Sequence, residues 1–287
     1  MIYLEKQDIH STLTTWLYCH VAMLWEAEKQ GKQGYINWHN GVKSYYDAEK
    51  FSQIPNQFEW YFKQPFGDRD ETWTWEVSGW DKSGIGGLYA QPISVIKEYF
   101  KKYIEFNEET NRRGQLIVDK YNIDFSKTIG VTWRGTDIYL ESLNGNQGRK
   151  YTSIELYFEW IDKALEQIPD AKIACTAEED GILEPLLKRY PQAFKIDEFY
   201  QAPKGSKDNP ERFSPVSGYE RGLQPALMVW LFSKCAWLIK NRASTSAVAS
   251  WCSDGEIVNI CHTEVLGFPP HLEGIEYKGE IYPLNFI

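Results

Sequence analysis

The chain has 287 residues, a formal net charge of −9, a hydrophobic fraction of 43% and a charged fraction of 25%. This length allows one large domain or two of ordinary size, and this composition supports a substantial core. The acidic balance excludes a sequence-independent nucleic-acid binder, which needs a basic face, and provides no polybasic segment for an anionic membrane. The net negative charge is compatible with a small anionic ligand, because a few local cations and helix N-termini can hold one.

Cysteine and histidine usage argues against bound metal and disulfides. The 5 cysteines and 5 histidines show no zinc-ligand spacing and no disulfide framework. The N-terminal stretch MIYLEKQDIHSTL is too polar for a signal peptide. The most apolar run, residues 226–240, contains Ser233 and Lys234 and is too short to span a bilayer. We therefore expect a cytoplasmic protein with free thiols and no membrane span, whose oligomeric state is open.

The N-terminal part has an irregular pattern. The 12 Trp and 18 Tyr are numerous, which suits either an aromatic core or a protein that handles sugars. Residues 40–90 combine aromatics with turn formers and predict short elements and loops. Periodicity predicts strands over residues 1–4 and 35–38, a helix over 8–30 that ends at Gly31, and helical structure over 93–122.

From residue 123 onward strand and helix patterns alternate, which predicts an α/β domain with a mostly parallel sheet and helices on both faces. The predicted strands are 128–133, 171–176, 193–196, 236–240 and 256–261. The predicted helices are 153–168, 181–190, 223–234 and one that starts near 246. We expect two domains, residues 1–122 and 123–287, although no Gly/Ser-rich or Pro-rich linker marks the boundary.

Polar clusters follow three of these strands, and ligands of open parallel sheets bind beyond the carboxyl ends of the strands. Arg134 follows the first strand, and its guanidinium suits bidentate capture of a phosphate beside Gly135. An ion pair between Arg134 and Asp137 that closes the loop is the alternative. The stretch CTAEED, which contains Thr176, Glu178 and Glu179, follows the second strand and could bind a base edge or cap the next helix.

The serine-rich turn after the strand 236–240 offers a further cluster. Ser244, Thr245 and Ser246 precede a helix of small residues, where hydroxyls and free N–H groups can bind an anion. Ordinary N-capping of that helix by Ser244 or Thr245 is the alternative. Asp68 and Asp70 form an Asp-x-Asp pair, a weak metal signal, and the chain lacks both a P-loop and a G-x-S-x-G elbow.

Three stretches together resemble the motifs of the α1,6-, α1,2- and protein O-fucosyltransferase superfamily. They are IGVTWRGTD, CTAEEDGILEPLLKRYP and GLQPALMVWLFSKCAWLIKNRASTSAVASW, they lie in family order, and they cover about residues 127–252. The resemblance implies a GT-B fold, in which two Rossmann-like α/β domains face each other across a cleft. Thr132 stands where many members carry His, and Gly135 where many carry a second Arg.

The resemblance also implies roles for individual residues. Arg134 would bind the β-phosphate of the donor, helped by Ser244, Thr245 and Ser246, while Thr176 and Glu178 or Glu179 would lie at the base. Asp137 or Glu141 would orient Arg134 or accept the proton of the acceptor hydroxyl.

The function expected from this resemblance is inverting, metal-independent transfer of L-fucose from GDP-fucose to a hydroxyl of a glycan, with no other cofactor. Three alternatives stay open. They are a GT-B enzyme with another donor such as a UDP-sugar, a non-catalytic sugar-binding protein on the same scaffold, and a metal-dependent enzyme that uses Asp68 and Asp70.

Overall fold

The computed structural model describes residues 2–3, 13–38, 45–66, 88–89, 91–134, 153–204, 215–241, 243–262, 273–278 and 280–282. The predicted alternation of strands and helices is confirmed. The strands of the main sheet are β3 (Thr128–Trp133), β4 (Lys172–Ala177), β5 (Ala193–Lys195), β6 (Trp237–Asn241), β7 (Glu256–His262), β8 (Glu273–Tyr277) and β9 (Glu280–Tyr282).

The order of the strands is that of a doubly wound sheet. They follow the order β5-β4-β3-β6-β7-β8-β9, and the pairs from β5 to β7 are parallel. The chain starts in the middle at β3, proceeds to one edge through β4 and β5, and then returns to β6 and β7 on the other side. The last pairs, β7–β8 and β8–β9, are antiparallel, and this hairpin was not predicted from the sequence.

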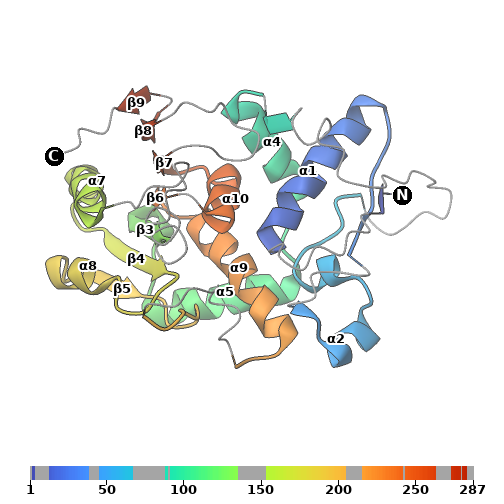
Figure 1. Ribbon diagram of the computed structural model, residues 1–287, viewed down its shortest axis with the longest axis horizontal. Coiled ribbons are helices and arrows are strands. Elements are labelled where there is room, and N and C mark those ends of the chain that lie inside the picture. Colours follow the sequence, from blue (N-terminus) through green and yellow to red (C-terminus); the bar gives the residue numbers. More distant parts are fainter. Residues whose placement is uncertain are drawn as a thin grey trace.

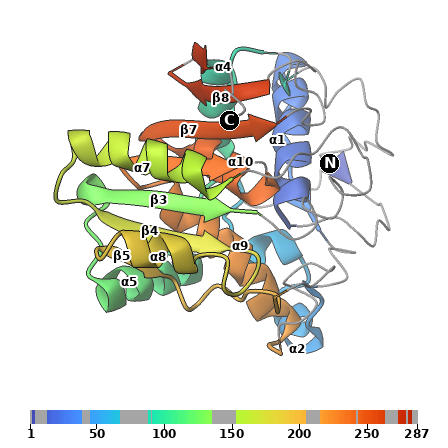
Figure 2. The ribbon, with the colours of Figure 1, turned by 60° about the vertical axis from the view of Figure 1, so that its left-hand side comes forward.

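Helices cover both faces of the sheet (Figures 1 and 2). On one face, α7 (Ile154–Gln167) and α8 (Glu184–Arg189) pack on strand residues such as Val131 and Ile239. On the other face, α9 (Gly218–Phe232) and α10 (Ser244–Cys252) pack on the residues that alternate with them, such as Leu238. The period of two in the strands therefore divides the apolar residues between two cores.

The N-terminal half contains mostly helices in its described part. β1 (Ile2–Tyr3) and β2 (Ile36–Asn37) form a separate parallel pair. The helical elements are α1 (Leu13–Lys29), α2 (Ala48–Gln53), η2 (Gln57–Trp60), α4 (Ile93–Tyr103), α5 (Glu108–Tyr121) and η3 (Phe125–Lys127). The helical pattern of residues 93–122 is divided because Asn107 caps α5, its side chain accepting from the Thr110 amide at 2.9 Å.

One continuous core joins the two halves of the chain. Buried residues of α1, among them Leu17, belong to the same cluster as Leu223 of α9 and Val248 of α10. Figure 1 shows α1 beside α10 and α9. The predicted boundary after residue 122 falls at the end of α5, where Asn122 adopts a left-handed conformation with φ 49°. The division into two domains stays a prediction, while the core extends across it.

The helices in the described ranges include none that combines the length and apolar character needed to span a bilayer.

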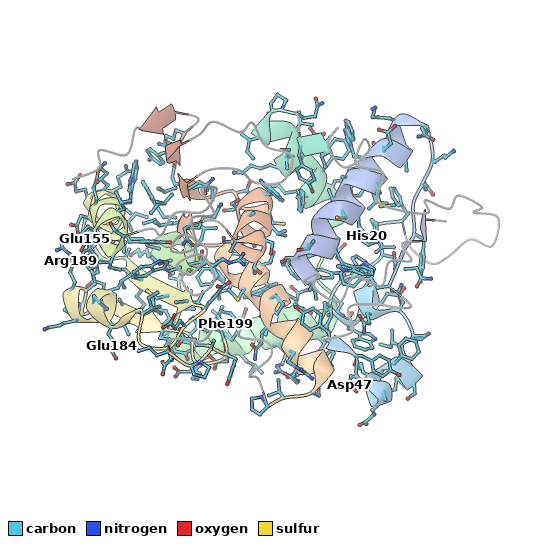
Figure 3. All side chains as sticks on the ribbon, in the orientation of Figure 1. His20, Asp47, Glu155, Glu184, Arg189 and Phe199 are labelled. Carbon is cyan, nitrogen blue, oxygen red and sulfur yellow. The ribbon has the colours of Figure 1, made fainter. Side chains whose placement is uncertain are left out.

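His20 on α1 should make the stability of the fold depend on pH (Figure 3). Its Nδ1 lies 2.7 Å from the carbonyl oxygen of Trp16, and the indole of Trp38 donates to the ring. Complete burial lowers the pKa of His20 to about 4, so the folded state holds the neutral ring.

The unfolded chain protonates this histidine near pH 6.5, whereas the folded chain does so only near pH 4. The stabilising contribution is therefore complete above pH 6.5, and about 3 kcal/mol is lost as the pH falls to 4. Urea unfolding of the wild type and His20→Asn across this range checks the prediction. The free energy of unfolding of the wild type should fall with decreasing pH more steeply than that of His20→Asn, by the slope that corresponds to the uptake of one proton. Parallel pH dependences of the two proteins would contradict the prediction.

Candidate functional site

The candidate site lies where the winding of the sheet reverses. β3 and β6 are neighbours, but the chain leaves them toward opposite edges, and open α/β sheets bind ligands beyond the carboxyl ends of the strands at such a point. Arg134 directly follows β3, and Asn241 is the last residue of β6. The Asn241 side chain accepts from the Arg134 amide at 2.8 Å and donates to the Arg134 carbonyl oxygen at 2.7 Å. This two-way contact fixes the backbone from which the guanidinium extends.

The Arg134 guanidinium lies beside a second predicted residue. Its Nε is 3.4 Å from Oε1 of Glu178, and the two side chains are 23% and 26% exposed. Glu178 follows β4, and its amide donates to the Trp133 carbonyl oxygen at 3.2 Å. A partly desolvated carboxylate at this distance orients the guanidinium. The predicted alternative partner, Asp137, lies outside the described residues.

The predicted hydroxyl cluster is present and includes a residue that the sequence did not indicate. Thr14, in the first turn of α1, donates to the Ser244 hydroxyl at 2.9 Å, and the Thr14 hydroxyl oxygen also lies 3.3 Å from that of Thr245. The N-terminal ends of α1 and α10 therefore meet. Each end carries a partial positive charge from the helix dipole, so an anion held between them would be stabilised by both.

The N-terminus of α10 is not capped in the way that the alternative interpretation predicted. The residue at the N-cap position is Ala243, which cannot provide a capping side chain, so N-capping by Ser244 or Thr245 is wrong. Ser246 is 2% exposed, and its hydroxyl lies 3.1 Å from the carbonyl oxygens of both Asn241 and Ala243. Ser246 therefore supports the turn, while Ser244 and Thr245 carry the hydroxyls near the surface.

The stretch CTAEED also does not cap the next helix, which was the alternative role considered for it. α8 begins only at Glu184, and its N-cap residue, Leu183, makes no side-chain cap. Instead, Glu178 and Glu179 run beside Ala202, since the Ala202 amide donates to the Glu178 carbonyl oxygen at 2.7 Å and Glu179 forms a parallel bridge with Ala202. The segment after β4 is thus tied to the segment after β5.

A row of polar residues crosses the sheet below this site, and of these the sequence analysis proposed only Thr176 as a site residue. Thr176, Thr132, Lys240 and Asn259 are in register on four adjacent strands. Lys240 is 4% exposed, and its ammonium donates to the Asn259 side-chain oxygen at 3.0 Å. Among the described residues, the buried Thr132 hydroxyl has no hydrogen-bond partner. A lysine within the apolar strand AWLIKN was the signal that could have indicated this row.

Several predicted residues fall outside the described part of the chain. These are Asp137 and Glu141, the candidate bases, and the Asp68–Asp70 pair. Within the residues that the structure does describe, no group of three His, Cys, Asp or Glu side chains could hold a metal ion. The roles of Asp137 and Glu141 stay predictions.

Comparison with known proteins gives a likeness in structure only. No protein-family model matches the sequence, and no curated protein matches it significantly. Among solved structures, the NodZ α-1,6-fucosyltransferase soaked with GDP-fucose has a TM-score of 0.52 at 11% identity, over 95% of this chain and 96% of that one. NodZ co-crystallised with GDP has a TM-score of 0.51 at 12% identity, over 86% and 91%. NodZ from Bradyrhizobium has a TM-score of 0.50 at 12% identity, over 87% and 92%.

These matches confirm the fold that the three motifs predicted. They extend over nearly the whole of both chains, so the likeness includes the N-terminal half, where the sequence resembles the family only loosely. The chain therefore has an α/β fold like that of the NodZ structures, and Arg134, Glu178, Ser244 and Thr245 lie at the carboxyl edge of its parallel sheet.

Proposed function

We propose that the chain is an inverting, metal-independent glycosyltransferase that transfers L-fucose from GDP-fucose to a hydroxyl of a glycan acceptor. The observation that carries the proposal is the position of Arg134 at the switch point of the sheet, on a backbone held by Asn241. The fold of fucosyltransferases crystallised with GDP and GDP-fucose supports the choice of donor.

The proposed reaction is a single displacement at the anomeric carbon. The acceptor oxygen forms a bond to that carbon while the bond to the β-phosphate oxygen breaks, and the electron pair leaves with the nucleoside diphosphate. Arg134 and the N-terminal end of α10 stabilise the negative charge that develops on the leaving group. The proton of the acceptor hydroxyl passes to a carboxylate, for which Asp137 and Glu141 are the candidates.

The proposed scheme gives parts to further residues, supported by their contacts in the structure. Glu178 orients the guanidinium of Arg134 at 3.4 Å. Ser244 and Thr245 offer hydroxyls to the diphosphate, and Thr14 presents a hydroxyl from the other half of the chain to the same place. Binding at this point would thus involve both halves.

Titration calorimetry with GDP-fucose, GDP and UDP tests the donor. We expect GDP-fucose and GDP to bind with 1:1 stoichiometry, UDP to bind at least tenfold more weakly, and EDTA to change none of these affinities. The anomeric configuration of the product, determined by NMR, checks inversion. Binding of UDP alone would replace the donor, and glycan binding without transfer would support the non-catalytic alternative.

A further inference from the structure

A buried lysine lies at the carboxyl end of the sheet, next to the proposed donor site. Lys240 is the fourth residue of β6 and is 4% exposed. It directly precedes Asn241, whose side chain holds the backbone of Arg134. Lys240 is in register with Thr132, two residues before Arg134. Because neighbouring strands lie about 4.8 Å apart and a strand rises about 3.3 Å per residue, the Cα atoms of Lys240 and Arg134 are about 8 Å apart.

The alternation of side chains along β6 places Lys240 on the face of the sheet that α10 covers. Ile239 belongs to the core beneath α7 and α8, whereas Leu238 belongs to the core beneath α9 and α10. Lys240 is two residues after Leu238 and therefore lies on the second of these faces. The first turn of α10 is fixed to the same strand end, since the Ser246 hydroxyl lies 3.1 Å from the Asn241 carbonyl oxygen. The lysine and the positive N-terminal end of α10 thus share one end of β6 and one face.

A structural role explains the position of Lys240 only in part. Its ammonium donates to the Asn259 side-chain oxygen at 3.0 Å, which joins β6 to β7. A glutamine could donate a similar bond without the cost of burying a charge. The neighbouring Thr132 is 6% exposed, and in the described part of the chain its hydroxyl has no hydrogen-bond partner, so the row does not bond every polar group to the next strand. These observations favour a role that uses the charge of Lys240.

A buried charge acts on a nearby anion more strongly than an exposed one, because solvent and salt screen it less. Arg134, Ser244 and Thr245 carry the groups that can contact a bound diphosphate. Lys240 is almost fully covered by its surroundings, so its ammonium would act on the same ligand through its electric field and not by contact.

We propose that Lys240 is a positioning residue of the donor site, whose buried positive charge draws the diphosphate onto Arg134 and the N-terminal end of α10. The inference rests on the proposed function for the place of the diphosphate. It gives the site a preference by ligand charge, since the attraction increases with the negative charge of the ligand. A nucleoside diphosphate should therefore gain more affinity from Lys240 than the matching monophosphate.

Titration calorimetry of the full chain with GDP, GMP and pyrophosphate tests this assignment. Lys240→Gln keeps a donor for Asn259 but removes the charge, and Lys240→Met removes both. We expect each variant to bind GDP and pyrophosphate about tenfold more weakly than the wild type, and GMP about threefold more weakly. Lys240→Arg keeps the charge and should keep the ratio of GDP to GMP affinity within about twofold. A lysine that only joined β6 to β7 would give wild-type binding in Lys240→Gln and the same loss for every ligand in Lys240→Met.

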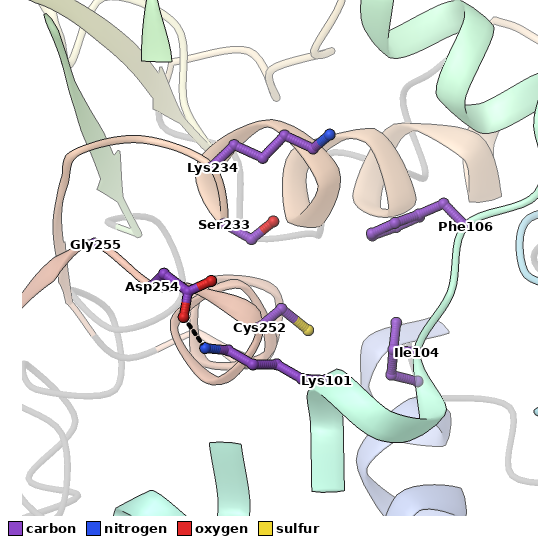
Figure 4. A pocket seen from close by; sticks show the side chains of 8 residues that line it. All are labelled: Lys101, Ile104, Phe106, Ser233, Lys234, Cys252, Asp254 and Gly255. Atoms are coloured by element: carbon purple, nitrogen blue, oxygen red, sulfur yellow. Dashed lines mark hydrogen bonds and ion pairs between the residues drawn. The ribbon is translucent and has the colours of Figure 1, made fainter. Parts of the chain in front are cut away.

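Two lysines near the amino end of the same sheet provide matched controls. Lys172, the first residue of β4, donates to the carbonyl oxygens of Tyr121 and Asn122 at 3.0 and 2.7 Å. Lys101 on α4 pairs with Asp254, which precedes β7 (Figure 4). Lys172→Gln and Lys101→Gln each remove one charge far from the carboxyl edge, so both should bind all three anions within about twofold of the wild type.

The outcomes separate this inference from the proposed function. Wild-type affinity in Lys240→Gln, or an equal loss for GDP and GMP in both neutral variants, overturns the role of Lys240 and leaves the proposed donor intact. Binding of pyrophosphate but not of GDP by the wild type overturns the donor, and the pyrophosphate affinities then decide on Lys240 alone. Binding of neither anion by the wild type overturns both. Thermal melts establish that each variant is folded, and Lys240→Met, which suits an apolar environment, keeps the test decisive if Lys240→Gln does not fold.

Discussion

Replacing Arg134 by alanine should greatly weaken donor binding and transfer while leaving the protein folded. The guanidinium provides charge-assisted hydrogen bonds at the place where the leaving group gains charge, so its loss should lower kcat/KM about 10²–10³-fold. Stability should change little, because the ion pair with Glu178 is about a quarter exposed on both sides and the Asn241 contacts use only the Arg134 backbone. Calorimetry with GDP and a thermal melt measure the two effects.

Arg189→Ala is the matched control. Arg189 also pairs with a carboxylate, Asp162 at 2.7 Å, but it lies on α8 on the outer face of the sheet (Figure 3). Its removal should leave both binding and stability close to the wild type. Arg134→Lys should fall between wild type and Arg134→Ala, since it keeps the charge but not the bidentate fork. A large loss of stability in Arg134→Ala would show that the arginine is structural.

Gly114→Ala should destabilise the protein strongly, although alanine favours helices over glycine by about 1 kcal/mol. Gly114 lies within α5, and a Cβ added there would be 2.5 Å from Cε3 of Trp230, a ring of the core. The indole of Trp230 is held by a 2.7 Å hydrogen bond to Asn111, so it cannot simply move aside. We expect a net loss of about 3 kcal/mol in the free energy of unfolding.

Urea unfolding of three further variants tests the cause of that loss. Gln115→Ala, at the exposed neighbouring position, should change stability by less than about 0.5 kcal/mol. If the clash with the ring is responsible, Gly114→Ala combined with Trp230→Leu should be less destabilised than the sum of the two single changes. Strict additivity would show that the alanine acts through the backbone of α5 instead.

The sheet was predictable because its strands are buried on both faces and separated by amphipathic helices. The sequence TIGVTW predicted the strand that became β3, and the position of Arg134 after it followed from the topology of parallel sheets. The hairpin β8–β9 was missed because its short antiparallel strands provide little periodicity.

The site could be predicted only where the type of residue by itself indicates a ligand-binding role. An arginine and a serine-rich turn do so, whereas Asn241 and Thr14 gain their roles from contacts across 107 and 230 residues of the chain. Pattern reasoning also assigned Ser246 to the ligand, but its burial in the turn depends on where α10 begins. The pairing of Glu178 with Arg134 could not be predicted without knowing the register of β3 and β4.

The core that α1 shares with α9 and α10 limits how the molecule can move. Opening the two halves as separate rigid bodies would bring Leu17, Leu223 and Val248 into water at once, at a cost of several kcal/mol. In the proposed reaction, α1 is therefore expected to stay seated on α9 and α10 throughout the cycle.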